Sequence, residues 1–398
     1  MFINKKYPVV QNPYLRGYMH IYDLLATVMS SIRPRKKEGP IKKILLRNPA
    51  ALGDVLYTLR LVRAIKEKNP YVSIGLLIGS WALPFVENAL DVDTIHIEDH
   101  WALNRRHISL KDKVICWRKT RKKALDEIKK EKYDLAVDLY YYYPSASFLF
   151  WQAGIPMRIG YDSHEGSSLY TKTVPWKNQD IHNLEYQANL FTDGTISLSD
   201  LAQTKAVMRF DTTDEQFLQK YALQPKKYIV ISVGTGAPDR EWPIDYWQEL
   251  LFRLNYGINH NEIPQFIFVG AGKKEKGRID ILLNKLGNRG KSLCNQLTIP
   301  QLMQVIRNSR LFIGLESFAG HIAAMYKTPQ VSIMHGATNQ MQWQPFANPN
   351  CTVIRRNLSC SPCYFPSRCA YKNACMAIPV ESVYKGVMKN LEETTHLL

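Results

Sequence analysis

Short apolar runs alternate with helical patterns along most of the chain, beginning at residue 41. Runs of four to seven residues rich in Val, Ile, Leu and Phe lie at 41–46, 72–78, 135–139, 228–233, 266–269, 311–315 and 331–334. Buried strands joined by crossover helices give this alternation, and such strands assemble into parallel sheets. The stretch 191–227 has only short apolar pieces and separates the first three runs from the last four. The pattern therefore predicts an α/β protein with two doubly wound sheets.

The length of the chain agrees with two cores. At 398 residues it exceeds the roughly 250 to 300 residues at which single cores stop growing. Hydrophobic residues make up 45% of the chain, so it can bury large cores, and it has no convincing tandem repeat. We expect an N-terminal amphipathic and basic extension over 1–40, a first domain over 41–205, a second domain over 206–385 and a C-terminal helix or tail over 386–398.

The extension carries a helical pattern between residues 14 and 32. Its apolar side chains recur at spacings of three and four residues, as on one face of an amphipathic helix, and they are Leu15, Met19, Tyr22, Leu25, Ala26 and Met29. A basic run with two prolines follows at 33–40 and is typical of a linker. Two interpretations remain: a helix that lies on a membrane surface beside a polybasic segment, or a helix docked on the body of the protein.

The formal net charge is +17, and the excess is concentrated. Between residues 104 and 132 the chain has twelve Lys and Arg residues against four Asp and Glu residues. Such a field attracts polyanions, although a solvated basic helix over 118–132 would give the same count. Aromatic residues in this stretch are few and no nucleic-acid motif is present, so we expect an anionic glycolipid or a membrane surface and no nucleic acid.

No export signal or membrane span is visible near the start of the chain. The first apolar stretch, around 18–28, is interrupted by His20 and Asp23 and falls short of the roughly 18 unbroken apolar residues of a span. We therefore expect a cytoplasmic protein, with contact to the inner membrane as the peripheral alternative. Seven cysteines without an export signal argue against a disulfide framework.

Four of these cysteines are clustered near the C-terminus. Cys360 and Cys363 form a CxxC pair, and Cys369 and Cys375 follow within sixteen residues of the first. Four thiols match the ligand number of a closed tetrahedral site, for which zinc or a mononuclear iron is suitable. The alternative is a set of reduced structural thiols.

The segment 47–59 has the first candidate catalytic residue. A strand leaves into a turn of small residues, Gly53 allows a close turn, and Asp54 falls at the opening of a helix. Ligands of open parallel sheets lie at the carboxyl ends of strands, so Asp54 is placed to reach a ligand. The alternative is that Asp54 only caps the helix. The helix N-terminus should also stabilise the carboxylate, which predicts a weak base in the resting state.

Two segments of the second half suit a diphosphate. After the run 228–233, Thr235 and Gly236 offer a hydroxyl and a backbone N–H, and Arg240 offers bidentate charge. After the run 311–315, Glu316 ends a strand, and Ser317 to His321 open a helix whose first N–H groups can bind phosphate oxygens. The alternatives are an ordinary turn with a surface Arg and a structural histidine.

In this order, the three segments resemble glycosyltransferase family 9, the bacterial heptosyltransferases of lipopolysaccharide core synthesis. The resemblance covers roughly residues 41–385. It depends on LGDVLYTL around Asp54, NPYVSIGLLIG from residue 69, GIPMRIGYD at 154–162, REWPIDYW at 240–247, and SFAGHIAA at 317–324 followed by YKTPQVSIMHGATN. Each element alone is modest, and five in register are specific.

The resemblance implies a GT-B fold, two facing Rossmann-like domains with parallel sheets, and a metal-independent inverting transfer with no required cofactor. Asp54 would be the general base of the first domain. In the second domain, Thr235, Gly236 and Arg240 would hold the donor diphosphate, and Glu275 would contact the ribose. Phosphate and donor sugar would be bound by Glu316, Ser317, Phe318, Ala319, Gly320 and His321.

Some positions depart from the family pattern. Members often have Lys at the position of Arg240, and many have Asp and Thr, followed by Gly, where this chain has Glu316, Ser317 and Phe318. The longer acid and the bulkier Phe318 would reshape the sugar pocket, which leaves ADP-heptose as the favoured donor among similar sugars. The cysteines resemble a cluster in protein-modifying members that bind iron.

These observations predict a glycosyltransferase that takes heptose, or a similar sugar, from a nucleotide donor to a hydroxyl of a lipopolysaccharide core or other surface glycan. Two alternatives remain open from the sequence. One is a glycosyltransferase with a protein acceptor. The other is a catalytically inactive nucleotide-sugar-binding protein of the same fold.

Overall fold

A computed structural model of the chain describes residues 12–31, 40–177, 179–191, 196–259, 261–262, 265–364 and 369–395. The basic run 33–39 and Ile32, at the end of the expected N-terminal helix, lie outside these residues. The chain divides into two compact units. Unit 1 comprises residues 1–179 and 183–207, and unit 2 comprises residues 180–182 and 208–398.

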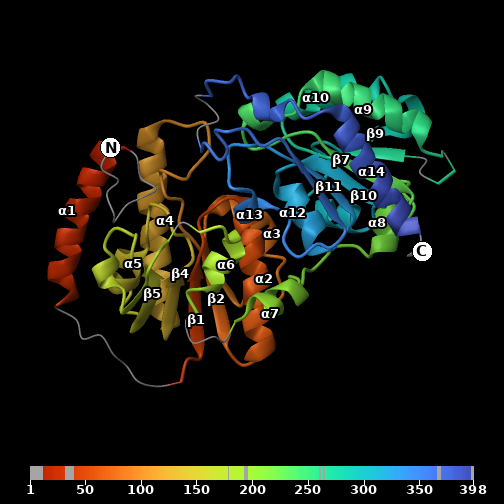
Figure 1. Cartoon of the computed structure of the whole chain (residues 1–398). Coiled ribbons are helices and arrows are strands. Elements are labelled where there is room, and N and C mark those ends of the chain that lie inside the picture. Colours follow the sequence, from red (N-terminus) through yellow and green to blue (C-terminus); the bar gives the residue numbers. More distant parts are fainter. Residues whose placement is uncertain are drawn as a thin grey trace. The chain divides into compact units, whose positions relative to one another are not determined.

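Unit 1 is built on a six-stranded, all-parallel sheet (Figure 1). Its strand order is β3-β2-β1-β4-β5-β6. The strands are β1 (Lys43–Arg47), β2 (Ser73–Ile78), β3 (Thr94–Ile97), β4 (Leu135–Asp138), β5 (Met157–Tyr161) and β6 (Lys172–Val174). This is the doubly wound order in which the chain reverses direction across the sheet between β1 and β4.

Helices cover this sheet and supply its core contacts. Helix α2 is buried on nearly all sides, since residues 55–62 are buried in succession and the helix also contacts α6 and α7. The helices of unit 1 are α1 (Pro13–Ser30), α2 (Leu52–Lys68), α3 (Leu83–Val86), α4 (Leu110–Glu131), α5 (Ser147–Gln152), α6 (Asn183–Ala188) and α7 (Leu198–Gln203), with short 3-10 turns η1 (Ser80–Ala82) and η2 (Ser167–Leu169).

Unit 2 repeats the same plan in a second all-parallel sheet. Its strand order is β12-β11-β10-β7-β8-β9, with the reversal between β7 and β10. The strands are β7 (Tyr228–Ser232), β8 (Gln265–Phe268), β9 (Gly290–Ser292), β10 (Leu311–Leu315), β11 (Gln330–Met334) and β12 (Cys351–Arg355). The four central strands β7, β8, β10 and β11 are buried along almost their whole length.

The helices of unit 2 pack a large core against this sheet. Trp242 and Trp247 are fully buried in it and cross at nearly right angles, with ring centroids 5.1 Å apart. The helices are α8 (Asp214–Lys220), α9 (Ile244–Gly257), α10 (Lys273–Leu283), α11 (Ile299–Arg307), α12 (Phe318–Met325), α13 (Gln340–Trp343) and α14 (Val380–Thr395), with 3-10 turns η3 (Pro238–Arg240), η4 (Gly287–Arg289) and η6 (Ala374–Met376).

The expectation of two doubly wound parallel sheets is confirmed, since all seven apolar runs contain or form strands. Within the part of the chain that the structure describes, no helix has the length and apolar character needed to cross a membrane. The expected N-terminal helix is present as α1, and it docks on unit 1 through its contacts with η2 (Figure 1).

Candidate functional site

Asp54 lies at the chain reversal of unit 1. It is the third residue of α2, which follows the carboxyl end of β1, and the helix is capped by Ala51 without a side-chain hydrogen bond. The Asp54 carboxylate instead accepts a hydrogen bond from the side-chain amide of Asn183 in α6. Asp54 therefore does not act as the N-cap, and its carboxylate is held by a residue distant in sequence.

A polar network fixes the start of α2 behind this carboxylate. The Thr58 hydroxyl donates to the Gln187 amide oxygen at 2.9 Å, and Asn48 donates to the Thr58 oxygen at 2.8 Å. The Asn48 amide oxygen also accepts the N–H of Ala50 at 3.1 Å. These buried partners satisfy one another, so the turn that precedes Asp54 has a single arrangement.

The pKa of Asp54 is raised to about 7, mainly by burial of its carboxylate. The hydrogen bonds from Asn183 and from the backbone at Ala51, and the charge of Arg105, all act in the opposite direction but do not offset the burial. The expectation of a weak base was therefore wrong: desolvation outweighs the helix N-terminus. A carboxylate with this pKa is suited to accept a proton near neutral pH.

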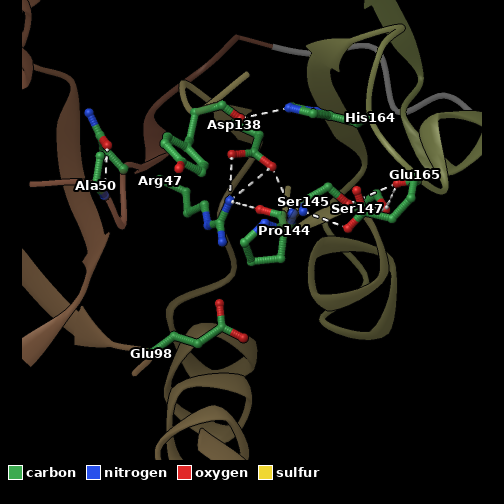
Figure 2. Close-up of polar contacts among 12 residues, drawn as sticks. Arg47, Ala50, Glu98, Asp138, Pro144, Ser145, Ser147, His164 and Glu165 are labelled. Carbon is green, nitrogen blue, oxygen red and sulfur yellow. Dashed lines mark hydrogen bonds and ion pairs between the residues drawn. The ribbon is translucent and has the colours of Figure 1, made fainter. Parts of the chain in front are cut away.

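A buried ion pair supports the same edge of the sheet. Arg47 at the end of β1 lies 3.1 Å from Asp138 at the end of β4, and both side chains are almost inaccessible to solvent (Figure 2). Arg47 also donates to the Pro144 carbonyl at 2.7 Å, and Asp138 accepts from Ala146 N–H at 2.7 Å and from the Tyr170 hydroxyl at 2.9 Å. The pair thus joins β1 and β4 with the loop that follows β4 and with the connection between β5 and β6, where Tyr170 lies.

Further buried polar residues extend this cluster. Glu98 accepts from Arg121 at 2.9 Å and from the Trp117 indole, and its carboxylate also faces the Arg47 guanidinium (Figure 2). Glu165 accepts the N–H of Ser145 at 2.7 Å, while its other oxygen is buried without a hydrogen-bond partner. Burial raises the pKa of Glu165 to about 7.

In unit 2, Arg240 and Glu316 come together at the chain reversal between β7 and β10. The Arg240 guanidinium lies 3.7 Å from the Glu316 carboxylate, which also accepts from the Thr338 hydroxyl at 3.2 Å. His335, which follows β11, lies 3.4 Å from the same carboxylate. Burial acts to raise the pKa of Glu316, but His335, Arg240 and His321 outweigh it and leave the pKa lowered. Glu316 is therefore ionised and surrounded by donors.

Ser317 stands beside Glu316 at the start of α12. Its side-chain oxygen is buried, has no hydrogen-bond partner among the described residues, and does not cap the helix. An unpartnered hydroxyl next to the free N–H groups of a helix N-terminus is suited to the oxygens of a phosphate. One turn later, burial lowers the pKa of His321 to about 4, so this imidazole is neutral at pH 7. Phe318, Ala319 and Gly320 complete this first turn, with Ala319 and Gly320 buried.

The loop after β7 uses some of the groups expected to bind a ligand. The Thr235 hydroxyl donates to the Ala237 carbonyl at 2.7 Å and accepts the Ala237 N–H at 3.0 Å, so it stabilises its own turn. Gly236 is exposed at the tip. The Arg240 guanidinium contacts Glu316, and its buried Nε atom has no hydrogen-bond partner within the part of the chain that the structure describes.

Glu275, which is predicted to contact the ribose, lies on α10 beside the loops that follow β7 and β8. Its carboxylate is wedged between two glycines, since a Cβ atom at Gly234 or Gly270 would lie 2.4 Å and 2.3 Å from its carboxyl carbon. It accepts the N–H of Ala271 at 3.1 Å and a backbone hydrogen bond from Gly234. Glu275 thus joins the loops that follow β7 and β8.

The structure does not gather the four C-terminal cysteines into a metal site. Among the described residues, which include Cys360, Cys363, Cys369 and Cys375, no three Cys, His, Asp or Glu side chains converge as metal ligands. All four are free thiols, and the Cys369 sulfur accepts the N–H of Asn373 at 3.3 Å. The donor set does not fit a bound zinc or iron, so no chemical role is derived for a metal.

Comparison with known proteins identifies the family of this chain. A sequence profile described as glycosyltransferase family 9 (heptosyltransferase) matches residues 121–374, which is more than half of the chain. The chain belongs to glycosyltransferase family 9. Lipooligosaccharide heptosyltransferase 2 of Campylobacter jejuni is 32% identical to this family 9 protein over 178 residues. That alignment covers 43% of this chain and 53% of the relative, about half of its length.

Solved structures show the same fold. A family 9 glycosyl transferase from Veillonella parvula superposes with a TM-score of 0.73 at 16% identity, over 90% of this chain and 99% of that one. ADP-heptose lps heptosyltransferase II of E. coli superposes with a TM-score of 0.66 at 17% identity, over 89% and 99%. The expected GT-B fold of this family 9 protein is therefore confirmed.

Sequence analysis did not propose some of the residues that lie near the carboxyl ends of the strands in the two sheets. Asn183 contacts Asp54 across 129 residues of sequence, and no local pattern marks it. Asp138 is the last residue of the buried strand β4, and Glu316 directly follows β10. A carboxylate at the carboxyl end of a buried strand was the signal that could have found Asp138. His335 likewise follows the run that forms β11.

Proposed function

We propose that this protein is an inverting glycosyltransferase that moves heptose from ADP-heptose to a hydroxyl of a lipopolysaccharide core or related surface glycan. Unit 1 supplies the base, Asp54, and unit 2 binds the donor. The observation that carries the proposal is the group at the start of α12, where the unpartnered Ser317 hydroxyl lies beside ionised Glu316 and Arg240. Family membership and relatives named as heptosyltransferases support the same reaction class.

The charges of the residues in unit 2 indicate which part of the sugar donor each of them binds. Arg240, the Ser317 hydroxyl and the first N–H groups of α12 suit the negative diphosphate. Glu316 is anionic and would repel phosphate, so it accepts hydrogen bonds from hydroxyl groups of the donor sugar. Neutral His321 contributes a donor without a charge of its own. These roles fit a nucleotide sugar better than a free nucleotide.

The transfer step follows from these groups. Asp54 accepts the proton of the acceptor hydroxyl as that oxygen attacks the anomeric carbon of the donor. The bond from this carbon to the diphosphate breaks, the electron pair leaves with ADP, and a single displacement inverts the anomeric configuration. Arg240 and the α12 N-terminus stabilise the charge that develops on the departing diphosphate. No cofactor enters this step.

A panel of nucleotides tests the donor assignment. We expect ADP and ADP-heptose to raise the melting temperature of the protein, because a ligand that binds the folded state stabilises it by mass action. UDP, GDP and CDP should raise it less. Replacement Arg240→Met should remove most of the shift caused by ADP, while Lys285→Met, at an exposed lysine of unit 2, should retain it. Equal shifts from all nucleotides would contradict the choice of ADP.

The raised pKa of Asp54 predicts the pH dependence of transfer. A base must be deprotonated, so kcat/KM should rise about ten-fold per pH unit below a midpoint near 7 and level off above it. The Asn183 hydrogen bond lowers this pKa, so Asn183→Ala should move the midpoint to higher pH. Glu165 also has a pKa of about 7, and Glu165→Gln serves as the control that should leave the midpoint in place. If Glu165→Gln moved the midpoint and Asn183→Ala did not, the titrating group would be Glu165 and not Asp54.

A further inference from the structure

The N-terminal helix α1 is fixed to unit 1 by one of its faces. Met19 and Ala26 are 1% and 2% exposed, and the Asp23 carboxylate accepts the N–H of Gly166 at 2.8 Å. Tyr22 packs edge-on against Phe148 of α5, with ring centroids 6.2 Å apart. These contacts hold the helix in one orientation, so the direction of its opposite face is also set.

The face of α1 that points away from these contacts is apolar and exposed. Six large apolar side chains lie on it, between 50% and 89% exposed: Tyr14, Tyr18, Ile21, Leu24, Leu25 and Val28. Five of them follow spacings of four, three, four and three residues, and at 3.6 residues per turn all six fall within an arc of roughly 120°. The six residues are called the outer face of α1 here. A continuous apolar stripe of this kind marks an interaction surface.

The charges around this helix indicate which partner covers the outer face. The sequence places Arg33, Arg35, Lys36 and Lys37 directly after α1, within a chain of net charge +17. Helix α4 lies close to α1 in the same unit, since its Arg121, which is paired with Glu98, lies 5.9 Å from the ring centroid of Phe148, the residue that Tyr22 contacts. Helix α4 also has cationic side chains that are exposed. The exposed residues Arg118, Lys119 and Lys122 continue this basic surface.

An apolar stripe beside dense positive charge matches an anionic lipid surface. Acyl chains accept the apolar side chains, and headgroup phosphates neutralise the cations. A second copy of this chain would bring the same positive charges together and would be repelled. Helix α1 also includes Arg16, His20 and Asp23, so it is suited to lie along the surface of a bilayer.

We propose that the outer face of α1 seats unit 1 on an anionic membrane surface, with the exposed basic residues of α4 contacting the headgroups. This binding is independent of the transfer reaction. It would bring the enzyme to the layer in which a lipid-linked acceptor is found, and it needs no donor, acceptor or catalytic residue.

Vesicle sedimentation of the full chain tests the proposal. The vesicles are phosphatidylcholine alone, or phosphatidylcholine and phosphatidylglycerol in equal parts, without any sugar substrate. We expect binding to the anionic vesicles only, and a loss of binding at high salt. The double variant Ile21→Gln with Leu25→Gln should bind at least about ten-fold more weakly, because two apolar side chains no longer enter the bilayer.

A matched control replaces two other exposed apolar residues with the same spacing on a helix. Phe252→Gln with Tyr256→Gln on α9 removes a comparable apolar area, and it should bind vesicles within about two-fold of the unchanged protein. Equal weakening by both double variants, or no binding of the unchanged protein, would overturn the proposal. So would a dimer in sedimentation velocity that the α1 variant alone converts to monomer, since a second copy would then cover the outer face. Because the assay contains no donor, each result is independent of the proposed transfer.

Discussion

Replacement of Asp54 by Asn is expected to lower kcat for sugar transfer by about 10²- to 10⁴-fold, the range typical of a lost general base. Asparagine keeps the size of the side chain, and its amide oxygen can still accept the hydrogen bond from Asn183. It cannot take the proton of the acceptor hydroxyl. Initial rates at saturating donor and acceptor measure the change.

Donor binding separates loss of chemistry from loss of structure. The groups proposed to hold the donor belong to unit 2, so the Kd for ADP of the Asp54→Asn variant should stay within about two-fold of the unchanged protein. Asp91→Asn makes the same chemical change at a partly exposed ion pair with Arg63 and should leave kcat unaltered. Full turnover by the Asp54→Asn variant would refute the assignment of the base and favour another carboxylate.

The Asp54 result also has a stability consequence with a definite sign. A carboxyl group whose folded pKa is about 7, above its unfolded value near 4, binds a proton more tightly in the folded state. Its contribution to the free energy of unfolding therefore falls as the pH rises from about 4 to 7. The Asn variant has no such titration. The difference in free energy of unfolding between the variant and the unchanged protein should therefore shift in favour of the variant from pH 5 to pH 8.

Removal of the Asp138 carboxylate is expected to lower the free energy of unfolding of unit 1 by about 3 to 5 kcal/mol. The Asp138→Ala variant leaves the Arg47 guanidinium buried without its ion-pair partner, and it leaves the Ala146 N–H and the Tyr170 hydroxyl without an acceptor. Such an uncompensated buried charge is among the largest single-residue effects on stability. Hydrogen exchange of the β1 and β4 amides reports it.

Two comparisons make this measurement specific. Exchange of the β10 and β11 amides, in unit 2, should be unchanged, because the ion pair belongs to unit 1. Asp280→Ala breaks an exposed pair with Lys276 and should cost about 0.5 kcal/mol or less. Adding Arg47→Met to Asp138→Ala should recover part of the loss, since the unpaired charge is then gone. A cost near zero for Asp138→Ala would mean that water reaches the guanidinium.

The strands show what an apolar pattern can and cannot predict. All seven runs became strands because the inner strands of a parallel sheet are covered on both sides and must be apolar. The three-residue strands β6 and β9 were missed because they lie at sheet edges, where polar residues such as Lys172 and Lys291 are tolerated. Strand β5 was missed because Arg158 interrupts it, and this side chain is satisfied by the backbone carbonyl of Leu169 at 2.7 Å.

For the candidate site, too, some features could be predicted from the sequence and others could not. Asp54, Arg240 and Glu316 could be proposed from sequence because each closely follows a strand, and parallel strands bring their carboxyl ends to one edge. The raised pKa of Asp54 could not be predicted from the sequence, since it depends on how much of the carboxylate the fold covers. The hydroxyl of Thr235 bonds to its own turn, and the Glu275 carboxylate on α10 bonds to the Ala271 N–H, which only coordinates reveal. Their roles in binding a ligand stay predictions.

The position of the Glu275 carboxylate depends on two glycines, Gly234 and Gly270. Gly234 and Gly270 each leave room for the same carboxyl group and have none for a methyl group. Alanine at either glycine would displace the Glu275 carboxylate from the N–H groups of Ala271 and Gly234. The three positions should therefore change together during evolution, although they are spread over more than forty residues of sequence.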